Sequence, residues 1–165
     1  MSASYREAMA GVHALVEPVT FLLGEWEGSG EGLWPGGFSF TDHLRFTTDG
    51  RPLVEYRQTT ATADGTPSHG EVGYLLLKPG GTVHMTVAQP SGITETLEGH
   101  VRGGVLSLRS VEIGHTPGAK AVTASERRIS LGDGVLVAEL AIAMNGEPLA
   151  PHTRSQLRRS QRTKT

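Results

Sequence analysis

The sequence of 165 residues contains no cysteine. This absence excludes disulfides, thiolate nucleophiles, iron–sulfur clusters and cysteine-ligated zinc, and it fits a reducing compartment. We therefore expect the protein in the cytoplasm. Any metal must depend on histidine or carboxylate ligands.

Long apolar runs and a surplus of one charge are also missing. The longest apolar stretch, Val19–Leu23, is far shorter than the ~20 residues that span a bilayer. The N-terminus lacks the basic region and apolar core of a signal peptide. Fifteen Lys and Arg against 17 Asp and Glu leave a formal charge of −2, without the basic excess of nucleic-acid-binding proteins. We expect neither a membrane nor a nucleic acid as partner.

Several catalytic signatures are absent as well. The sequence has no Gly-x-Ser-x-Gly elbow, no His-Glu-x-x-His and no glycine-rich phosphate loop followed by Lys-Ser/Thr. The standard hydrolase and nucleotide-binding interpretations therefore have no support.

Glycine and β-branched residues dominate what is present. The 22 glycines give nearly twice the usual share of ~7%, and valine and threonine are abundant, which favours strands. From Gly24 onward, short runs with period-two apolarity alternate with turn signals. The turn signals lie at 34–37, 49–52, 64–67, 79–81, 89–92, 103–104, 114–118, 132–134 and 145–148. Nine such breaks separate about ten strands.

This pattern predicts an all-β fold in which about ten antiparallel strands close into an up-and-down β-barrel, since closure removes exposed strand edges. Ten strands leave more room inside than eight, which predicts a cavity. We expect one domain, 1–165, with the barrel over about 22–160.

Only the N-terminal stretch has helical spacing. Apolar residues between Tyr5 and Val16 lie three or four apart, and Pro18 is expected to end the helix. This predicts a short helical cap over about 4–17. The cap either closes one end of the barrel or lies on its outer wall.

A glycine-rich run, Gly24–Gly32, alternates glycine with other residues. It lacks the strand–turn–helix context of a dinucleotide loop. Glycines at every second position open one face of a strand, so the run is either a close-packed barrel seam or a surface for a flat ligand.

The seven histidines are the remaining candidates for metal chemistry. No His-x-His or His-x-x-x-His pair supports zinc, but a haem needs only one neutral imidazole as its proximal ligand. His152 is the best placed, since Pro148 and Pro151 restrict the backbone that leads to it. The alternative is a polar residue of the barrel wall.

Five segments that occur in order resemble the nitrobindin family, ferric-haem barrels of calycin-like shape related to fatty-acid-binding proteins. They are Gly24-Glu-Trp-Glu-Gly-Ser-Gly30, with Gly24, Trp26, Gly28 and Gly30 as the signature; His69-Gly-Glu-Val-Gly-Tyr-Leu75; Ala88–Glu95; Ala119–Ala124; and Pro148–Arg159. The resemblance covers nearly the whole chain.

The resemblance implies one haem b per chain, with His152 as the axial iron ligand. His152 would then be the catalytic residue, acting through the iron that it binds. The resemblance also implies that Lys120 is a nearby cofactor-binding lysine. It also implies binding of NO to ferric iron, isomerisation of peroxynitrite to nitrate and a possible homodimer. The sequence identifies no distal histidine. Two positions depart from the family: Gly36 stands in a shortened loop where a haem-contacting threonine is usual, and Thr153 replaces an aliphatic residue.

Two other functions fit the predicted barrel. One is a carrier of a fatty acid or other small apolar ligand without haem, in which Arg45, Arg57 or Arg109 would bind a carboxylate if it points inward. The other is a structural or partner-binding barrel, supported only by the basic tail Arg154–Thr165.

Overall fold

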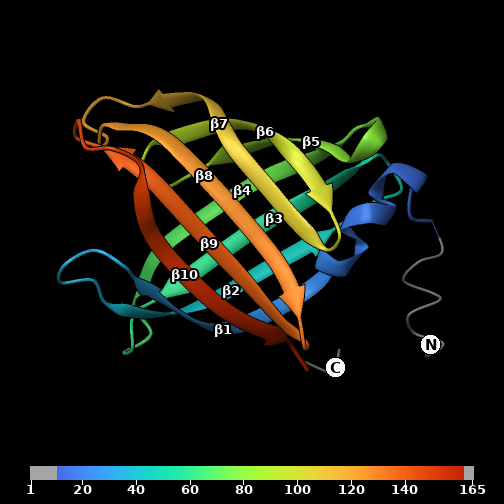
Figure 1. Ribbon diagram of the computed structural model, residues 1–165. Helices are drawn as coiled ribbons and strands as arrows, with labels where there is room; N and C mark the ends of the chain where they lie inside the picture. The colour runs from blue at the N-terminus through green and yellow to red at the C-terminus, as the bar shows by residue number, and fades with distance from the viewer. Residues whose placement is uncertain (1–10, 162–165) are drawn as a thin grey trace.

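Ten strands form one closed antiparallel barrel in the computed structural model, which describes residues 11–161 (Figure 1). The strands are β1 (Gly24–Gly32), β2 (Ser39–Thr47), β3 (Leu53–Ala61), β4 (Pro67–Leu77), β5 (Thr82–Ala88), β6 (Ile93–Arg102), β7 (Val105–His115), β8 (Val122–Gly132), β9 (Val135–Met144) and β10 (Ala150–Arg159). Each strand pairs with its neighbours in sequence, and β10 pairs with β1. The predicted fold is confirmed, and every predicted break overlaps a connection between strands.

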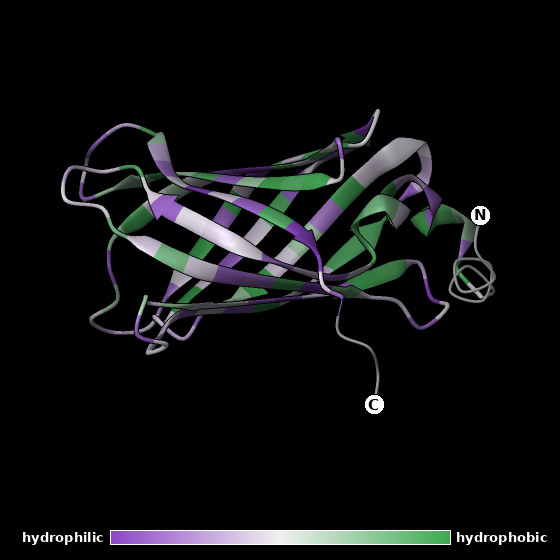
Figure 2. Cartoon of the chain, turned by 90° about the horizontal axis from the view of Figure 1, so that it is seen from below, coloured by the Kyte–Doolittle hydropathy of each residue, from purple (hydrophilic) through white to green (hydrophobic). Residues whose placement is uncertain are grey.

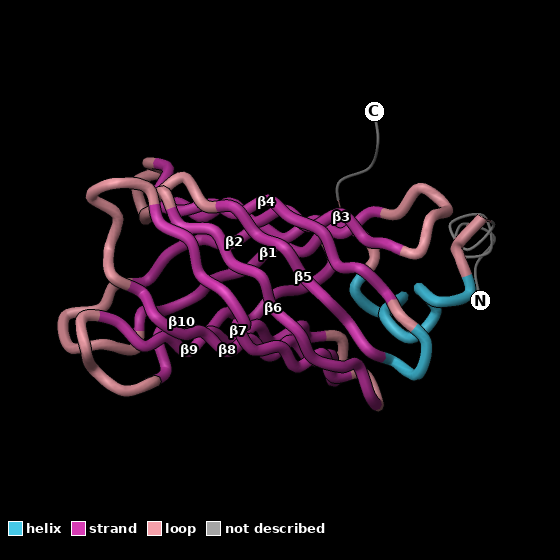
Figure 3. The backbone as a smooth tube through the Cα atoms, turned by 90° about the horizontal axis from the view of Figure 1, so that it is seen from above, coloured by secondary structure: helices cyan, strands magenta, loops and turns pink. Residues whose placement is uncertain are grey.

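The barrel has two different ends. One, here called the loop end, is formed by the connections 33–38, 62–66, 89–92, 116–121 and 145–149. The other, the helix end, carries the 3₁₀ helix η1 (Ala14–Leu22) and the short turn η2 (Pro79–Gly81). Figure 3 shows the helical segments gathered at one end of the barrel, away from the longer loops. Among residues 11–161, no helix is long and apolar enough to cross a membrane.

The helix η1 closes the helix end. Its residues Val16, Val19 and Leu22 are completely buried and belong to the same apolar cluster as the barrel interior. Of the two predicted placements, the structure therefore has the plug and not the outer wall. The first part of the predicted cap, up to residue 10, lies outside the described residues.

The expectation that Pro18 ends the helix is wrong. Pro18 lies inside η1, which continues to Leu22. Proline lacks the N–H that a helix uses, so it removes one hydrogen bond. In this segment of short 3₁₀ turns, the burial of Val19 and Leu22 against the barrel outweighs that loss.

Alternation along the strands builds the core. In β2, Phe40, Asp42, Leu44 and Phe46 point inward and are buried, while the residues between them lie outside. Figure 2 shows hydrophobic and hydrophilic residues alternating along the strands. The inner face of this strand also includes the charged residue Asp42, toward the loop end.

The seam between β1 and β10 explains part of the glycine run. Gly28 pairs with Leu157, and a Cβ on Gly28 would overlap the carbonyl oxygen of Gln156 on the neighbouring strand. A Cβ on Gly73 would meet the carbonyl of Thr86 in the same way, between β4 and β5. The backbones approach so closely only where glycine permits it, so these positions mark sharp bends of the barrel wall.

Trp26 ties the plug to this seam. Its side chain is buried, and its Nε1 donates a hydrogen bond of 2.7 Å to the carbonyl of Leu22, the last residue of η1. The Arg159 guanidinium lies 4.3 Å above the Trp26 ring and donates to the carbonyls of Phe21 and Leu23. The indole and the guanidinium thus join η1, β1 and β10.

We predict that Gly28→Ala lowers the free energy of unfolding by about 1–3 kcal/mol or more, because the new methyl group forces the seam apart. Gly132→Ala is the matched control: a Cβ there meets nothing within 4 Å, so this change is expected to be neutral or stabilising by about 0.4–1 kcal/mol. Urea unfolding of both variants measures the difference. Equal stability of the two would contradict the close approach at Gly28.

Candidate functional site

His152 lies at the loop end, in an irregular part of β10. Pro151 pairs with Ala141 and Thr153 pairs with Leu140, so His152 is an extra residue in the ladder. Such a β-bulge re-aims the side chain of its extra residue. The carbonyl of His152 accepts a hydrogen bond of 2.8 Å from the Leu33 N–H, which holds this point of β10 to the end of β1.

An aromatic ring covers one face of His152. The Trp34 ring stacks on the imidazole, with the ring centroids 4.5 Å apart and the planes inclined by 21°. A Cβ on Gly32 would overlap the Trp34 ring, so the glycine leaves the space into which the indole folds back. A tight turn follows Trp34. The Gly37 N–H donates to the Trp34 carbonyl, and Gly36 has a positive φ of 77°.

The imidazole of His152 is held neutral. Burial lowers its pKa from the ordinary value of 6.5, and the nearby charges of Lys120 and His69 lower it further. Within residues 11–161, neither ring nitrogen of His152 makes a hydrogen bond. A neutral imidazole with a free lone pair is the form that binds a metal.

Apolar side chains surround the loop end. The large apolar residues with more than a third of their surface exposed include Leu33, Phe38 and Leu149. Phe38 makes edge contacts with the rings of Trp34 and Phe40. Exposed apolar groups that gather in one place indicate a surface that binds an apolar partner or ligand.

Beneath this rim lies a buried polar layer. It consists of Asp42, Tyr56, Gln58, Glu71, Gln89, Glu95, Ser125, Arg127 and Ser155. Arg127 binds both oxygens of Glu71, at 2.6 and 3.0 Å, and also pairs with Glu95. Burial opposes ionisation of Glu71, but the charge of Arg127 and the hydrogen bonds from His69 and Arg127 outweigh it and lower the pKa of Glu71 to about 2. Glu71 is therefore a permanent carboxylate.

A second carboxylate in the polar layer behaves differently. Asp42 accepts hydrogen bonds from Gln58 Nε2, 3.0 Å from each oxygen, and from Ser155 Oγ at 2.6 Å. Burial nevertheless raises the pKa of Asp42, because these neutral donors compensate less than a guanidinium does.

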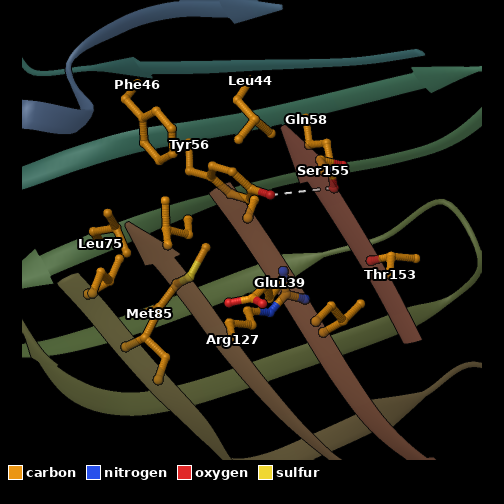
Figure 4. A pocket seen from close by; sticks show the side chains of 15 residues that line it. Leu44, Phe46, Tyr56, Gln58, Leu75, Met85, Arg127, Glu139, Thr153 and Ser155 are labelled. Carbon is orange, nitrogen blue, oxygen red and sulfur yellow. Dashed lines mark hydrogen bonds between the residues drawn. The ribbon is translucent and has the colours of Figure 1, made fainter. Parts of the chain in front are cut away.

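The interior below the polar layer is nearly full. Its cavity measures about 50 Å³, and Figure 4 shows Leu44, Phe46, Leu75 and Met85 around it. The hydroxyl of Tyr56 reaches toward Gln58 there (Figure 4). Large side chains and the η1 plug fill this part of the barrel. A second, larger hollow of about 830 Å³ is lined mainly by residues of β6 to β10, and it includes Leu33, Pro151 and Thr153 near the loop end.

The small cavity also bears on the carrier alternative. Ligand pockets usually measure about 300–1,000 Å³, so a fatty acid does not fit into the cavity of about 50 Å³ among Leu44, Phe46 and Leu75. The three candidate arginines point outward: Arg45 and Arg109 pair with surface glutamates, and Arg57 is exposed. The inward arginine is Arg127, whose charge Glu71 and Glu95 already neutralise.

The structure brings some predicted residues together and separates others. His152 and Lys120 lie at the same end, close enough for Lys120 to affect the pKa of His152. The signature glycines and Trp26 instead serve the seam and the plug. Sequence reasoning missed His69, Glu71 and Arg127. An inward charged residue in an otherwise apolar alternation was the available signal for Glu71 in β4.

Fold and site together define a small closed β-barrel with a neutral imidazole, that of His152, at its loop end. Residues 15–159 match the family model described as THAP4-like, heme-binding beta-barrel domain, and the chain belongs to this family. The resemblance to nitrobindins is thereby confirmed.

Several proteins of known name are similar to this chain in sequence over most of their own length. A peroxynitrite isomerase of Streptomyces griseus is 38% identical over 156 residues, which cover 89% of this chain and 84% of the relative. Peroxynitrite isomerase 1 of Rhodococcus jostii is 34% identical over 169 residues, 96% of each chain. The crystal structure of Rv2717c from M. tuberculosis superposes with a TM-score of 0.83 at 34% identity, covering 91% of this chain and 99% of that one.

We predict that Trp34→Ala raises the pKa of His152 toward 6.5, because burial is the largest cause of its lowered value. In the native protein, the stability that the neutral ring contributes is present above the ordinary pKa and is lost as the pH falls through the lowered one. An NMR titration of the imidazole resonances measures both proteins. Lys120→Gln should shift the pKa in the same direction by less, and a native His152 that titrates at or above 6.5 would contradict this account.

Proposed function

We propose that this chain binds one ferric haem b through His152 and isomerises peroxynitrite to nitrate. The observation that carries the proposal is a neutral imidazole with a free lone pair, in a member of a haem-binding barrel family. Relatives over 30% identical that bear the name peroxynitrite isomerase support the reaction.

The donor set fits haem better than a bare metal ion. Within residues 11–161, no group of three or more His, Asp or Glu side chains could hold a metal ion. A porphyrin brings four nitrogen ligands of its own and requires only one from the protein, with apolar surroundings. His152 supplies that ligand, and Trp34, Phe38 and Leu33 supply apolar surface. The cavity of about 50 Å³ is far too small for a porphyrin, whereas the hollow of about 830 Å³ has Pro151 and Thr153, the neighbours of His152, in its lining.

When bound, ferric haem supplies a Lewis acid for the peroxo oxygen and the electronic flexibility for the O–O rearrangement. His152 fixes the position of the group, because the bulge, the Leu33 hydrogen bond and the Trp34 ring restrict its own orientation. Lys120, exposed at the same end, provides positive charge for a propionate or for an approaching anion.

Three further expectations belong to the same proposal. The haem-loaded ferric protein would bind NO, two copies would form a homodimer, and the protein would work in the cytoplasm, in agreement with the cysteine-free sequence. Absorption spectra with NO, sedimentation equilibrium and cell fractionation test these in turn.

We predict that His152→Ala lowers haem affinity about 100-fold or more, since even loss of a residue that merely orients a metal ligand costs 10–100-fold. Haem titration followed by the Soret band measures the affinity. His84→Ala, which removes an exposed histidine from the outer face of β5, is the matched control and should bind haem normally. Unchanged affinity in the His152 variant would rule out the assigned ligand.

For Lys120→Gln we expect an about two- to fivefold slower reaction of the haem-loaded protein with peroxynitrite at low salt, and a weaker dependence on ionic strength, because one steering charge is lost. Lys78→Gln, at the helix end, serves as control and should leave both quantities unchanged. Stopped-flow kinetics at several salt concentrations provide the comparison. A Lys120 variant with the native rate and salt dependence would show that this lysine does not steer the anion.

A further inference from the structure

A second imidazole, His69, lies at the loop end together with His152. His69 belongs to the first residues of β4, and His152 to the first residues of β10. Around the closed barrel these strands are four positions apart in one direction and six in the other, so they form nearly opposite walls. The two rings are still close enough for His69 to lower the pKa of His152.

Buried charges hold the His69 ring from below. Its Nε2 lies 3.3 Å from Oε1 of Glu71, and Glu71 is bound through both oxygens by Arg127 of β8. Arg127 is anchored in turn by Glu95 of β6. The Glu71 side chain is 1% exposed, whereas that of His69 is 38% exposed. A rigid, buried carboxylate thus positions a ring that reaches the surface of the loop end.

The permanent carboxylate also decides which nitrogen of His69 is free. Glu71 stays ionised and can only accept a hydrogen bond, so the Nε2–H of His69 is directed toward it. Within residues 11–161, Nδ1 of His69 makes no hydrogen bond. That nitrogen is left for a group from outside the protein, and it donates when the ring is protonated.

We propose that His69 is a substrate-contacting residue, whose Nδ1–H donates a hydrogen bond to the small oxyanion held between the β4 and β10 walls. Glu71 and Arg127 act as positioning residues, because they reach the anion only through the His69 ring. This inference rests on the proposed haem function, since His152 must hold the iron from the opposite wall.

The chain His69–Glu71–Arg127 differs from a merely structural network in one respect. His115, the last residue of β7, also has one ring nitrogen bound, but the partner of its Nε2 is a backbone group, the carbonyl of Val122. The Nε2 of His69 instead faces the buried carboxylate of Glu71, which Arg127 holds through both oxygens, so the ring is fixed and its Nδ1 is left for a ligand.

The test compares an anionic with a neutral ligand on the same haem-loaded protein. Fluoride bound to ferric iron accepts hydrogen bonds, whereas NO depends on them little. At pH 6.0 we expect His69→Leu to weaken fluoride binding about tenfold or more and NO binding less than about threefold. His69→Gln keeps an N–H donor and should recover part of the fluoride affinity.

Two further variants complete the design. Glu71→Gln should weaken fluoride binding about three- to tenfold, less than His69→Leu does, because the His69 ring is then held less firmly in its position. His115→Leu is the control, a histidine at the end of β7 whose fluoride affinity should remain native. Haem affinity and thermal unfolding of every variant show whether it is folded and loaded.

The outcomes separate the two claims. Fluoride affinity of His69→Leu within twofold of the native value, in a variant that loads haem normally, would overturn the role of His69 and leave the haem function standing. Equal losses for fluoride and NO would also overturn it, since they would indicate a general disturbance of the site. A native protein that takes up no haem would overturn the proposed function and this inference together.

Discussion

Closure between β1 and β10 is the constraint on which the rest of this molecule depends. The seam brings Gly28 against the backbone of Gln156 and Leu157, closer than any side chain would allow. The same two strands carry Trp26 and Arg159, which fasten the η1 plug at the helix end. At their other ends they carry Gly32 and His152. One strand pair therefore shapes both the helix end and the loop end of the barrel.

The polar layer lies between the loop end and the apolar core of the barrel. Burying Glu71, Glu95 and Arg127 is expensive in free energy, and replacing such groups with apolar side chains is often neutral or stabilising. Arg127 Nε is buried and, within residues 11–161, has no hydrogen-bond partner, which adds to that cost. Stability alone does not explain such a layer. Its position directly beneath His69 and His152 agrees with a role in holding charged or polar groups at the loop end.

The apolar core leaves little space beneath the polar layer, and the candidate site lies at the rim of the barrel. The cavity among Leu44, Phe46, Leu75 and Met85 measures only about 50 Å³, so this part of the barrel is a rigid support. The short turn around Gly36 belongs to this arrangement, because it returns Trp34 onto the His152 ring. The missing threonine of this loop is thus accompanied by an aromatic contact with the proposed iron ligand, which buries the imidazole and keeps it neutral.

The sequence by itself determined the topology and singled out His152 as the proposed ligand. Turn signals at regular spacing and period-two apolarity predicted ten antiparallel strands, since these are local properties of the chain. The motif around His152 singled out one histidine of seven in the same local way. Local patterns did not predict that the helix continues past Pro18. Its continuation depends on the burial of η1 against residues that are far away in the sequence.

Only the tertiary structure decided which charges meet. His69 and Glu71 are two residues apart, but Arg127 lies 56 residues from Glu71, and His152 comes from the opposite wall. The volume of the cavity likewise depends on how side chains from all ten strands and from η1 fill one space. The period-two pattern determines which face of a strand points inward. Which side chains then contact one another inside depends on closure of the whole barrel.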